Sequence, residues 1–125
     1  MSQAIESMPV EVRDGELITR YLEFGAMAIR HAVVPAGADF GPVLRGLPGD
    51  RCPSDHWGIV LEGEIHVTYA DGTEEVTRAG DVYHWPAGHT ARTVERTVFI
   101  EVGPQAEMRQ FSDHARAVFA GASAT

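Results

Sequence analysis

Eight short strand-like segments follow one another closely between residues 17 and 102, and this succession constrains the fold more than any other feature. Several of them are rich in Val, Ile, Thr and Tyr with polar residues interleaved, which is typical of half-buried β-strands. Short strands with glycine-containing turns favour a β-sandwich or barrel over a parallel sheet with crossover helices. The predicted strands span residues 17–23, 26–34, 56–61, 64–69, 74–77, 81–85, 91–95 and 97–102.

The turns between these segments are marked by short motifs. Glu62-Gly63 and Glu95-Arg96 separate neighbouring strands, and residues 78–81 form another tight turn. Asp71-Gly72 is a strong short-range signal for a β-hairpin. The sequence therefore predicts a run of antiparallel neighbours.

Only the end of the chain has a helical pattern. Pro104 suits a first helical position. Apolar residues then recur at spacings of three and four, which predicts a helix over residues 105–119 that closes an edge or the open end of the β unit from outside. These residues are Met108, Phe111, Ala115, Val118 and Phe119.

The length of 125 residues predicts one domain with three parts. Residues 1–16 form an N-terminal arm, 17–103 the β-barrel, and 104–125 the helix and tail. Because the first 15 residues are polar and weakly patterned, we expect them to be loosely held or to pack on a partner. The arm and strands 17–34 could pair across the interface of a homodimer.

Charge and cysteine content exclude several classes of protein. Acidic residues outnumber basic ones 18 to 10, a net charge of -8, which disfavours binding to nucleic acid or to an anionic membrane. No apolar run approaches the roughly 18 residues that span a bilayer, and the first residues do not resemble a signal peptide. With one cysteine, Cys52, no intrachain disulfide can form. We expect a cytoplasmic protein whose Cys52 is free for packing, metal binding or chemistry.

Two segments, residues 50–63 and 80–89, carry the candidate chemistry. Together they hold the only cysteine, both tryptophans and three of the six histidines. On a straight strand Cys52 and His56 would lie roughly 13 Å apart, but a turn at residues 53–55 can fold His56 back toward Cys52. His84 and His89 flank a second turn. Thiolate and imidazole ligands suit zinc and can also hold Fe(II), Ni(II) or copper.

The turn framework of these segments resembles the two sequence motifs of the cupin superfamily. Ile59-Val60-Leu61-Glu62-Gly63 matches the end of the first motif. Gly80, followed after five residues by Pro86-Ala87-Gly88, matches the start of the second, with the predicted hairpin between them. The resemblance covers residues 17–103. It implies an all-β fold, a cupin jelly-roll (double-stranded β-helix) barrel with a C-terminal α-helix, and a candidate metal site, but no particular reaction.

The ligand positions depart from the cupin pattern. Counting back from Gly63, His56 stands where the motif has glutamate, and Cys52 and Asp50 stand where it has histidines. In the second motif Ala91 occupies the histidine position, and His89 lies two residues earlier with the same parity. The combination Cys-Pro-x-x-His-Trp-Gly with Pro-x-Gly-His is similar to that of a group of small single-domain bacterial cupins.

From this pattern we predict that Cys52, His56 and His89 hold one divalent metal ion. Zinc is favoured, and Fe(II) or Ni(II) also fit. His84 and Asp50 are the candidate catalytic residues. Alternatives remain for each: a buried packing role for Cys52, a fourth ligand or cross-strand packing for His84, and a plain turn at Asp50. Trp57 has the opposite parity to His56 and should face away from it.

The leading functional hypothesis is a metal-dependent enzyme that acts on a small organic molecule inside the barrel. Isomerase, lyase and oxygenase chemistry are all compatible with the resemblance. The alternative is a non-catalytic small-molecule-binding or sensor cupin. A cysteine nucleophile at Cys52 is a third hypothesis, for which the sequence offers no placed base or oxyanion hole.

Overall fold

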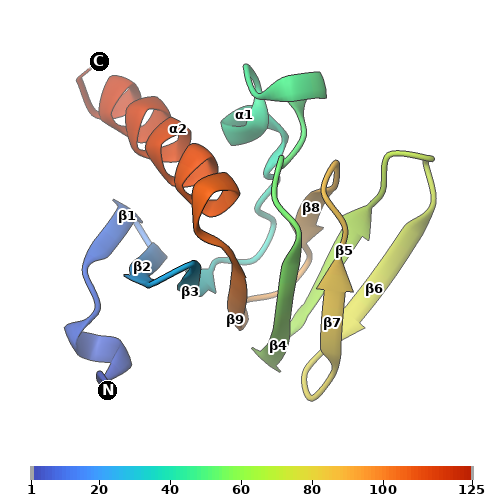
Figure 1. Ribbon diagram of the computed structural model, residues 1–125. Helices are drawn as coiled ribbons and strands as arrows, with labels where there is room; N and C mark the ends of the chain where they lie inside the picture. The colour runs from blue at the N-terminus through green and yellow to red at the C-terminus, as the bar shows by residue number, and fades with distance from the viewer. Residues whose placement is uncertain (1, 125) are drawn as a thin grey trace.

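Residues 2–124, the part of the chain that the computed structural model describes, form nine strands and two α-helices (Figure 1). All strand pairs are antiparallel. A six-stranded sheet has the order β1-β2-β3-β9-β4-β7, and a three-stranded sheet has the order β6-β5-β8. The elements are β1 (Val10–Asp14), β2 (Leu17–Phe24), β3 (Met27–Val34), α1 (Gly41–Leu44), β4 (His56–Glu62), β5 (Glu64–Thr68), β6 (Glu74–Arg78), β7 (Val82–Trp85), β8 (Thr90–Thr93), β9 (Thr97–Pro104) and α2 (Gln105–Ala124).

The main core lies between the two sheets. Residues of alternate parity point inward from both, as β3 shows with buried Ala28, Arg30, Ala32 and Val34 alternating with less buried neighbours. The core cluster joins residues of β3, β4, β7 and β9 to Ile65 and Val67 of β5. Two antiparallel sheets with a C-terminal helix confirm the predicted all-β jelly-roll architecture.

The predicted turns and strands agree closely with the structure. The eight predicted strands are β2 to β9, with ends that differ by one or two residues. Gly63, in the β4–β5 turn, has φ 78°. A side chain there would collide with the backbone carbonyl of Arg96 and with Thr97. Glycine is therefore required where the two sheets meet.

The expectation of a loosely held arm is wrong for the residues next to β2. Val10–Asp14 form β1, which pairs with β2, and Met8 and Val12 are buried. The strand was not predicted because its inward-facing residue Glu11 is charged. The carboxylate of Glu11 forms an ion pair with Arg30 of β3 in place of apolar packing. Both edges of β2 and of β3 are paired within this chain, and pairing of these strands across a dimer interface stays a prediction.

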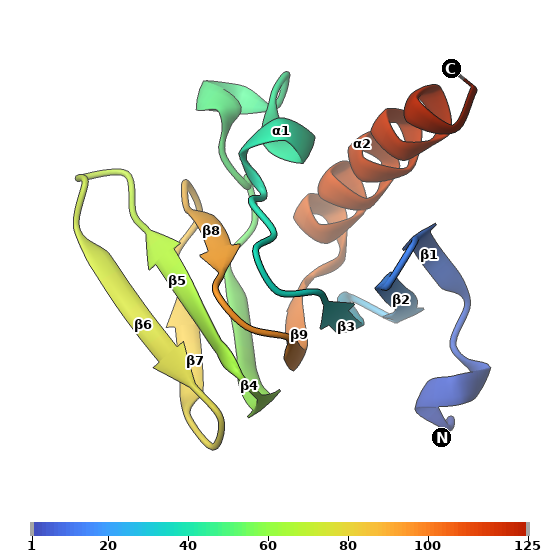
Figure 2. The same ribbon diagram turned by 180° about the vertical axis from the view of Figure 1, so that it is seen from behind.

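The C-terminal helix α2 starts at Gln105, as predicted, and runs to Ala124, five residues beyond the predicted end. It lies beside the six-stranded sheet (Figure 2). There Met108 packs against Tyr21 and Ala28. The short helix α1 was not predicted, and it contacts α2. Together the two helices close one end of the space between the sheets. Within residues 2–124 no helix is long and apolar enough to cross a membrane.

Candidate metal centre

Cys52, His56 and His89 come together in the interior, all three buried. One ligand atom from each lies within 4.8 Å of the ligand atoms of the other two. Cys52 Sγ is 3.1 Å from His56 Nε2, and the rings of His56 and His89 meet edge to face with centroids 5.0 Å apart. The turn at residues 53–55 thus brings His56 back to Cys52.

Backbone pairing holds the two segments of the cluster against each other. Cys52 N–H donates to the carbonyl of His89 at 3.0 Å, and Gly88 N–H donates to the carbonyl of Cys52 at 2.7 Å. His56 is the first residue of β4 and pairs with Trp85 of β7. The segments that resemble the two cupin motifs therefore meet at this cluster.

The Nδ1 atoms of the two histidines have different surroundings. His89 Nδ1 lies 2.7 Å from the carbonyl oxygen of Pro86, so Nδ1 donates and Nε2 is left with a lone pair for a ligand. His56 Nδ1 is buried without a hydrogen-bond partner. The carboxylate oxygen Glu101 Oε2 is 3.8 Å from this atom. Glu101 thus lies behind the cluster, on the side away from Cys52 Sγ.

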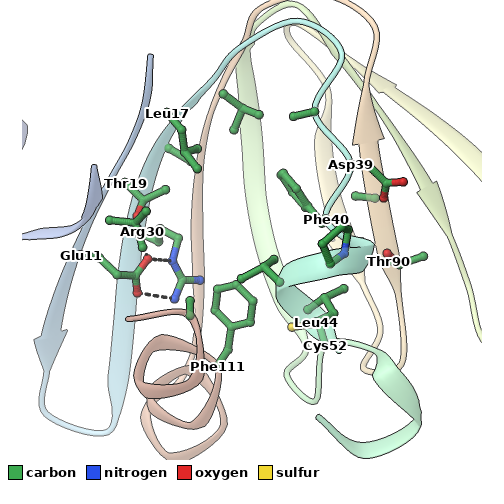
Figure 3. Close-up of a pocket in the computed structure, with 18 of the residues that line it drawn as sticks. Glu11, Leu17, Thr19, Arg30, Asp39, Phe40, Leu44, Cys52, Thr90 and Phe111 are labelled. Atoms are coloured by element: carbon green, nitrogen blue, oxygen red, sulfur yellow. Dashed lines mark hydrogen bonds and ion pairs between the residues drawn. The ribbon is translucent and has the colours of Figure 1, made fainter. Parts of the chain in front are cut away.

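The cluster lies on the wall of a cavity of about 380 Å³ between the sheets and the helices (Figure 3). Most of its wall is apolar, and Figure 3 shows Phe40 and Leu44 close to Cys52 with Phe111 between them and the opposite wall. Such a cavity suits a small organic molecule with an apolar body and a few polar atoms.

A buried ion-pair network extends from Glu101, beside the cluster, to Glu11 on the opposite wall. Arg30 donates from Nε and Nη2 to the two carboxylate oxygens of Glu11, at 2.8 and 2.9 Å, and from Nη1 to Glu101 Oε2 at 2.7 Å (Figure 3). Its guanidinium also lies over the rings of Phe111 and Tyr21, 4.7 and 5.3 Å from their centroids. Arg30 is thus committed to protein partners and is not free to bind an anionic ligand.

Burial sets the protonation of the site. It raises the pKa of the Cys52 thiol to about 12 and lowers the pKa values of His56 and His89. Burial also raises the pKa of Glu101, against the opposing charge of Arg30. Burial alone would raise the pKa of Glu11 too, but the charge and hydrogen bonds of Arg30 outweigh it and hold that pKa at about 2. Without a metal ion the cluster is therefore a neutral thiol beside two neutral imidazoles.

The structure does not bring the two predicted catalytic residues into this cavity. Asp50 is exposed in the turn before Cys52, where its carboxylate accepts a hydrogen bond from Gly46 N–H at 2.9 Å. His84 is exposed on β7, with Nε2 2.9 Å from Asp55 Oδ1 and its ring stacked on Trp57. The reason is strand parity: His84 points outward because its neighbours Tyr83 and Trp85 point inward. Trp57 faces outward, as expected.

Sequence reasoning missed the three charged residues of this network, Glu11, Arg30 and Glu101. A usable signal existed, since Arg30 and Glu101 each interrupt an apolar strand at an inward position. A charge in such a position needs a partner of opposite sign. The sequence does not show that Glu11, before the first predicted strand, completes the network.

Comparison with known proteins supports the fold. No protein-family profile and no curated protein matches the sequence. Among solved structures, a protein of unknown function from Rhizobium leguminosarum aligns with a TM-score of 0.62 at 20% identity, over 83% of this chain and 95% of its own. An RmlC-like cupin from Shewanella frigidimarina aligns with 0.57 at 22%, over 79% and 85%. KdgF from Halomonas sp. aligns with 0.58 at 16%, over 79% and 89%. At these identities the likeness establishes the cupin jelly-roll fold.

Proposed function

We propose that this protein, a chain with the cupin fold, binds one divalent metal ion through Cys52, His56 and His89 and is an enzyme for a small, largely apolar organic molecule. The observation that carries the proposal is the convergence of a thiol and two imidazoles, all buried, on the wall of an apolar cavity. A reducing cytoplasm would keep the thiol available as a ligand.

The donor set fits such an ion. In a tetrahedral zinc site, bond lengths of about 2.3 Å to sulfur and 2.0 Å to nitrogen place these two ligand atoms about 3.5 Å apart. Cys52 Sγ and His56 Nε2 lie 3.1 Å apart, so a small side-chain adjustment suffices. His89 already presents Nε2, since its Nδ1 donates to Pro86. Three protein ligands leave a further position for substrate, as catalytic zinc sites require.

The residues around the cavity position the ligand and the metal-binding side chains and keep water out. The aromatic and aliphatic wall excludes water from the ligand and orients its apolar body. Glu101 Oε2 lies 3.8 Å from His56 Nδ1, so a small side-chain shift would let its carboxylate accept a hydrogen bond from Nδ1–H and leave Nε2 directed toward the metal position. A bound divalent ion would act as a Lewis acid toward an oxygen atom of the substrate.

Metal content tests the site. The full-length protein is loaded separately with Zn(II), Fe(II) and Ni(II), dialysed, and analysed for metal per chain. We expect one ion per chain for at least one of them, and loss of at least nine-tenths of it in Cys52→Ala and His89→Ala. The matched control is His84→Ala, which removes an exposed histidine outside the cavity and should retain full occupancy.

Two results would contradict the proposal. One is wild-type protein that retains none of the three metals. The other is Cys52→Ala or His89→Ala protein that is folded by circular dichroism and retains as much metal as His84→Ala.

A non-catalytic binding protein is the second candidate. It is favoured by one observation: the buried charged groups of the cavity, Glu11, Arg30 and Glu101, are paired with one another rather than left free for chemistry. Metal-loaded protein incubated with a mixture of small alcohols, aldehydes, ketones and acids, followed by mass spectrometry, separates the two functions. Catalytic turnover converts a component beyond one equivalent, whereas a binding protein retains a component unchanged.

A further inference from the structure

Arg30 carries the one permanent positive charge among the described residues that line the cavity. The chain contains no lysine, and its other arginines lie outside the lining. A carboxylate that enters an apolar cavity loses its hydration and needs a cationic group to pair with. Apart from a bound metal ion, Arg30 is therefore the group in this cavity that could hold an anionic ligand.

The binding edge of Arg30 is already occupied. Its Nε and Nη2 atoms form the planar fork through which a guanidinium binds a carboxylate with two parallel hydrogen bonds. Both carboxylate oxygens of Glu11 occupy this fork, at 2.8 and 2.9 Å (Figure 3). On the other side of the guanidinium, Nη1 donates to Glu101 at 2.7 Å. The side chain of Glu11 therefore lies where the carboxylate of a ligand would bind.

Charge balance alone does not require Glu11. An ionised Glu101 would by itself neutralise Arg30, and the second carboxylate makes the network neutral or negative in either protonation state of Glu101. Burial raises the pKa of Glu11, but the charge and hydrogen bonds of Arg30 outweigh it and hold that pKa at about 2, so Glu11 is ionised at neutral pH. Two exposed residues of the lining, Asp14 and Asp39, are also acidic. An anion in this cavity therefore meets a wall without net positive charge.

The position of the ion pair separates a role in binding from a purely structural one. Glu11 joins β1 to β3 through Arg30, and a structural link would need no more than this. Both side chains also line the cavity, however, so the fork of Arg30 borders the space that a ligand would occupy. Loss of the Glu11 side chain would therefore expose the fork to the cavity.

We propose that Glu11 determines the charge specificity of the cavity: its carboxylate occupies Arg30 in place of a ligand, so that the site accepts uncharged molecules and rejects carboxylic acids. This specificity rests on the proposed function in one point, that the cavity is where the substrate binds. A fixed group that repels the wrong ligand is a general means of specificity. The substrate class that fits is an alcohol, aldehyde, ketone or amide with an apolar body.

Removal of the Glu11 side chain provides the test. Glu11→Ala deletes a methylene group and a carboxylate, the heavy atoms of acetate, and leaves the fork of Arg30 empty. The full-length variant is unfolded with urea at pH 7 in increasing sodium acetate, with acetamide as the neutral probe and sodium chloride to match ionic strength. We expect acetate to raise the unfolding midpoint saturably and to bind Glu11→Ala at least about tenfold tighter than wild type. Acetamide should have no such effect.

A longer pair of probes tests the wild-type cavity itself. Butyrate and butyramide have the same chain and differ in charge, and both are small enough for a cavity of about 380 Å³. Wild type should bind butyrate no tighter than butyramide, because Glu11 occupies the fork. Glu11→Ala should bind butyrate at least about tenfold tighter than butyramide, because a charged pair of hydrogen bonds replaces a neutral contact.

Two variants serve as controls. Glu11→Asp keeps the negative charge beside Arg30 and should continue to exclude acetate. Glu23→Ala removes the carboxylate that accepts hydrogen bonds from both Nε and Nη2 of Arg109 at the surface. It should respond to acetate as wild type does, since an arginine in water binds a carboxylate weakly.

The proposal is overturned if acetate stabilises folded Glu11→Ala no more than Glu23→Ala, which would make Glu11 a structural link only. It is also overturned if wild type binds butyrate tighter than butyramide in the presence of a chelator. If Glu11→Ala does not fold in chloride, refolding decides: recovery in acetate and not in acetamide supports the proposal, and recovery in neither contradicts it. All comparisons are made with and without a chelator, so their outcome does not depend on whether the chain binds a metal ion.

Discussion

Glu101 is the residue whose chemical role is least evident from the sequence and most evident from its contacts. Its carboxylate accepts a hydrogen bond from Arg30 and lies 3.8 Å from His56 Nδ1. Ligand histidines usually have such a carboxylate behind them, which fixes the tautomer and the ring orientation. In the proposed metal site Glu101 would therefore act as a positioning residue for His56.

We predict that Glu101→Gln weakens metal binding by about 10- to 100-fold. The amide keeps the size of the side chain but removes the negative charge that would favour a proton on His56 Nδ1. Competition with a chromophoric chelator measures the dissociation constant. Glu64→Gln, on the outward side of β5, is the control. An unchanged constant in folded Glu101→Gln would show that Glu101 does not act on His56.

Gly58 is a second residue whose importance appears only in three dimensions. A Cβ at this position would overlap the Ile100 carbonyl and the Tyr83 hydroxyl, on the strands that flank β4. Gly58→Ala should destabilise the protein by about 1–3 kcal/mol, because neither neighbour can move without disturbing the sheet. Urea unfolding measures this loss. Gly121→Ala, with open space around it, should not lower the midpoint, and equal midpoints for the two variants would contradict the argument.

At the scale of elements, the Glu11–Arg30–Glu101 network joins β1, β3 and β9 across the inner side of the six-stranded sheet. All three side chains are almost completely buried. Removing one partner of such a network leaves an uncompensated buried charge. This network therefore adds a buried side-chain link between β1 and the sheet to the backbone pairing of β1 with β2.

We predict that Arg30→Met lowers the free energy of unfolding by about 3–5 kcal/mol. Urea unfolding at pH 7 provides the measurement. Arg109→Met is a matched control, because Arg109 also forms a two-bond ion pair, with Glu23, but at the surface. Its midpoint should be nearly unchanged. Similar losses in the two variants would mean that burial of the network is not what stabilises it.

The same network predicts that the stability of the protein falls at acidic pH. The folded-state pKa of Glu11 is about 2, below its ordinary value of 4.5. A depressed pKa contributes stability that is present above pH 4.5 and is lost as pH falls from there toward 2. Glu11→Gln should therefore lose less stability than wild type between pH 4.5 and pH 2.5 in urea unfolding. If the stability of the two proteins falls equally over this pH range, Glu11 is not the group responsible for the acid sensitivity.

At the scale of the whole molecule, the proposed metal site joins parts of the chain that are distant in sequence. Cys52 and His56 precede the hairpin formed by β5 and β6, and His89 follows β7. An ion that binds only the folded chain stabilises it by mass action, by about 2.7 kcal/mol at a free concentration 100 times the dissociation constant. A bound metal ion would therefore stabilise the fold as well as act on a ligand.

We predict that metal raises the melting temperature of wild type and that a chelator reverses the increase. Differential scanning calorimetry with and without the metal provides the comparison. Cys52→Ala should show no increase at the same metal concentration. A similar increase in wild type and Cys52→Ala would assign the stabilisation to weaker sites elsewhere on the acidic surface.

Much of the fold could be predicted because its signals are local. The alternation in β2 to β9 and the turns at Gly63 and Gly72 depend only on neighbouring residues. The candidate ligands Cys52, His56 and His89 were also found from spacing and from the cupin resemblance. Strand β1 was missed because its buried inward residue is the charged Glu11, whose partner lies 19 residues away in sequence.

The sequence by itself determined the kind of fold, the positions of most strands and which residues could bind a metal, because strand periodicity and turn chemistry are encoded within a few residues. Only the tertiary structure decided that Cys52, His56 and His89 converge, that Asp50 and His84 lie outside the cavity, and that Arg30 is saturated by two carboxylates. It also decided that apolar residues of five strands share the outer side of the six-stranded sheet. These are consequences of strand register and sheet packing, which bring together residues that no local pattern connects.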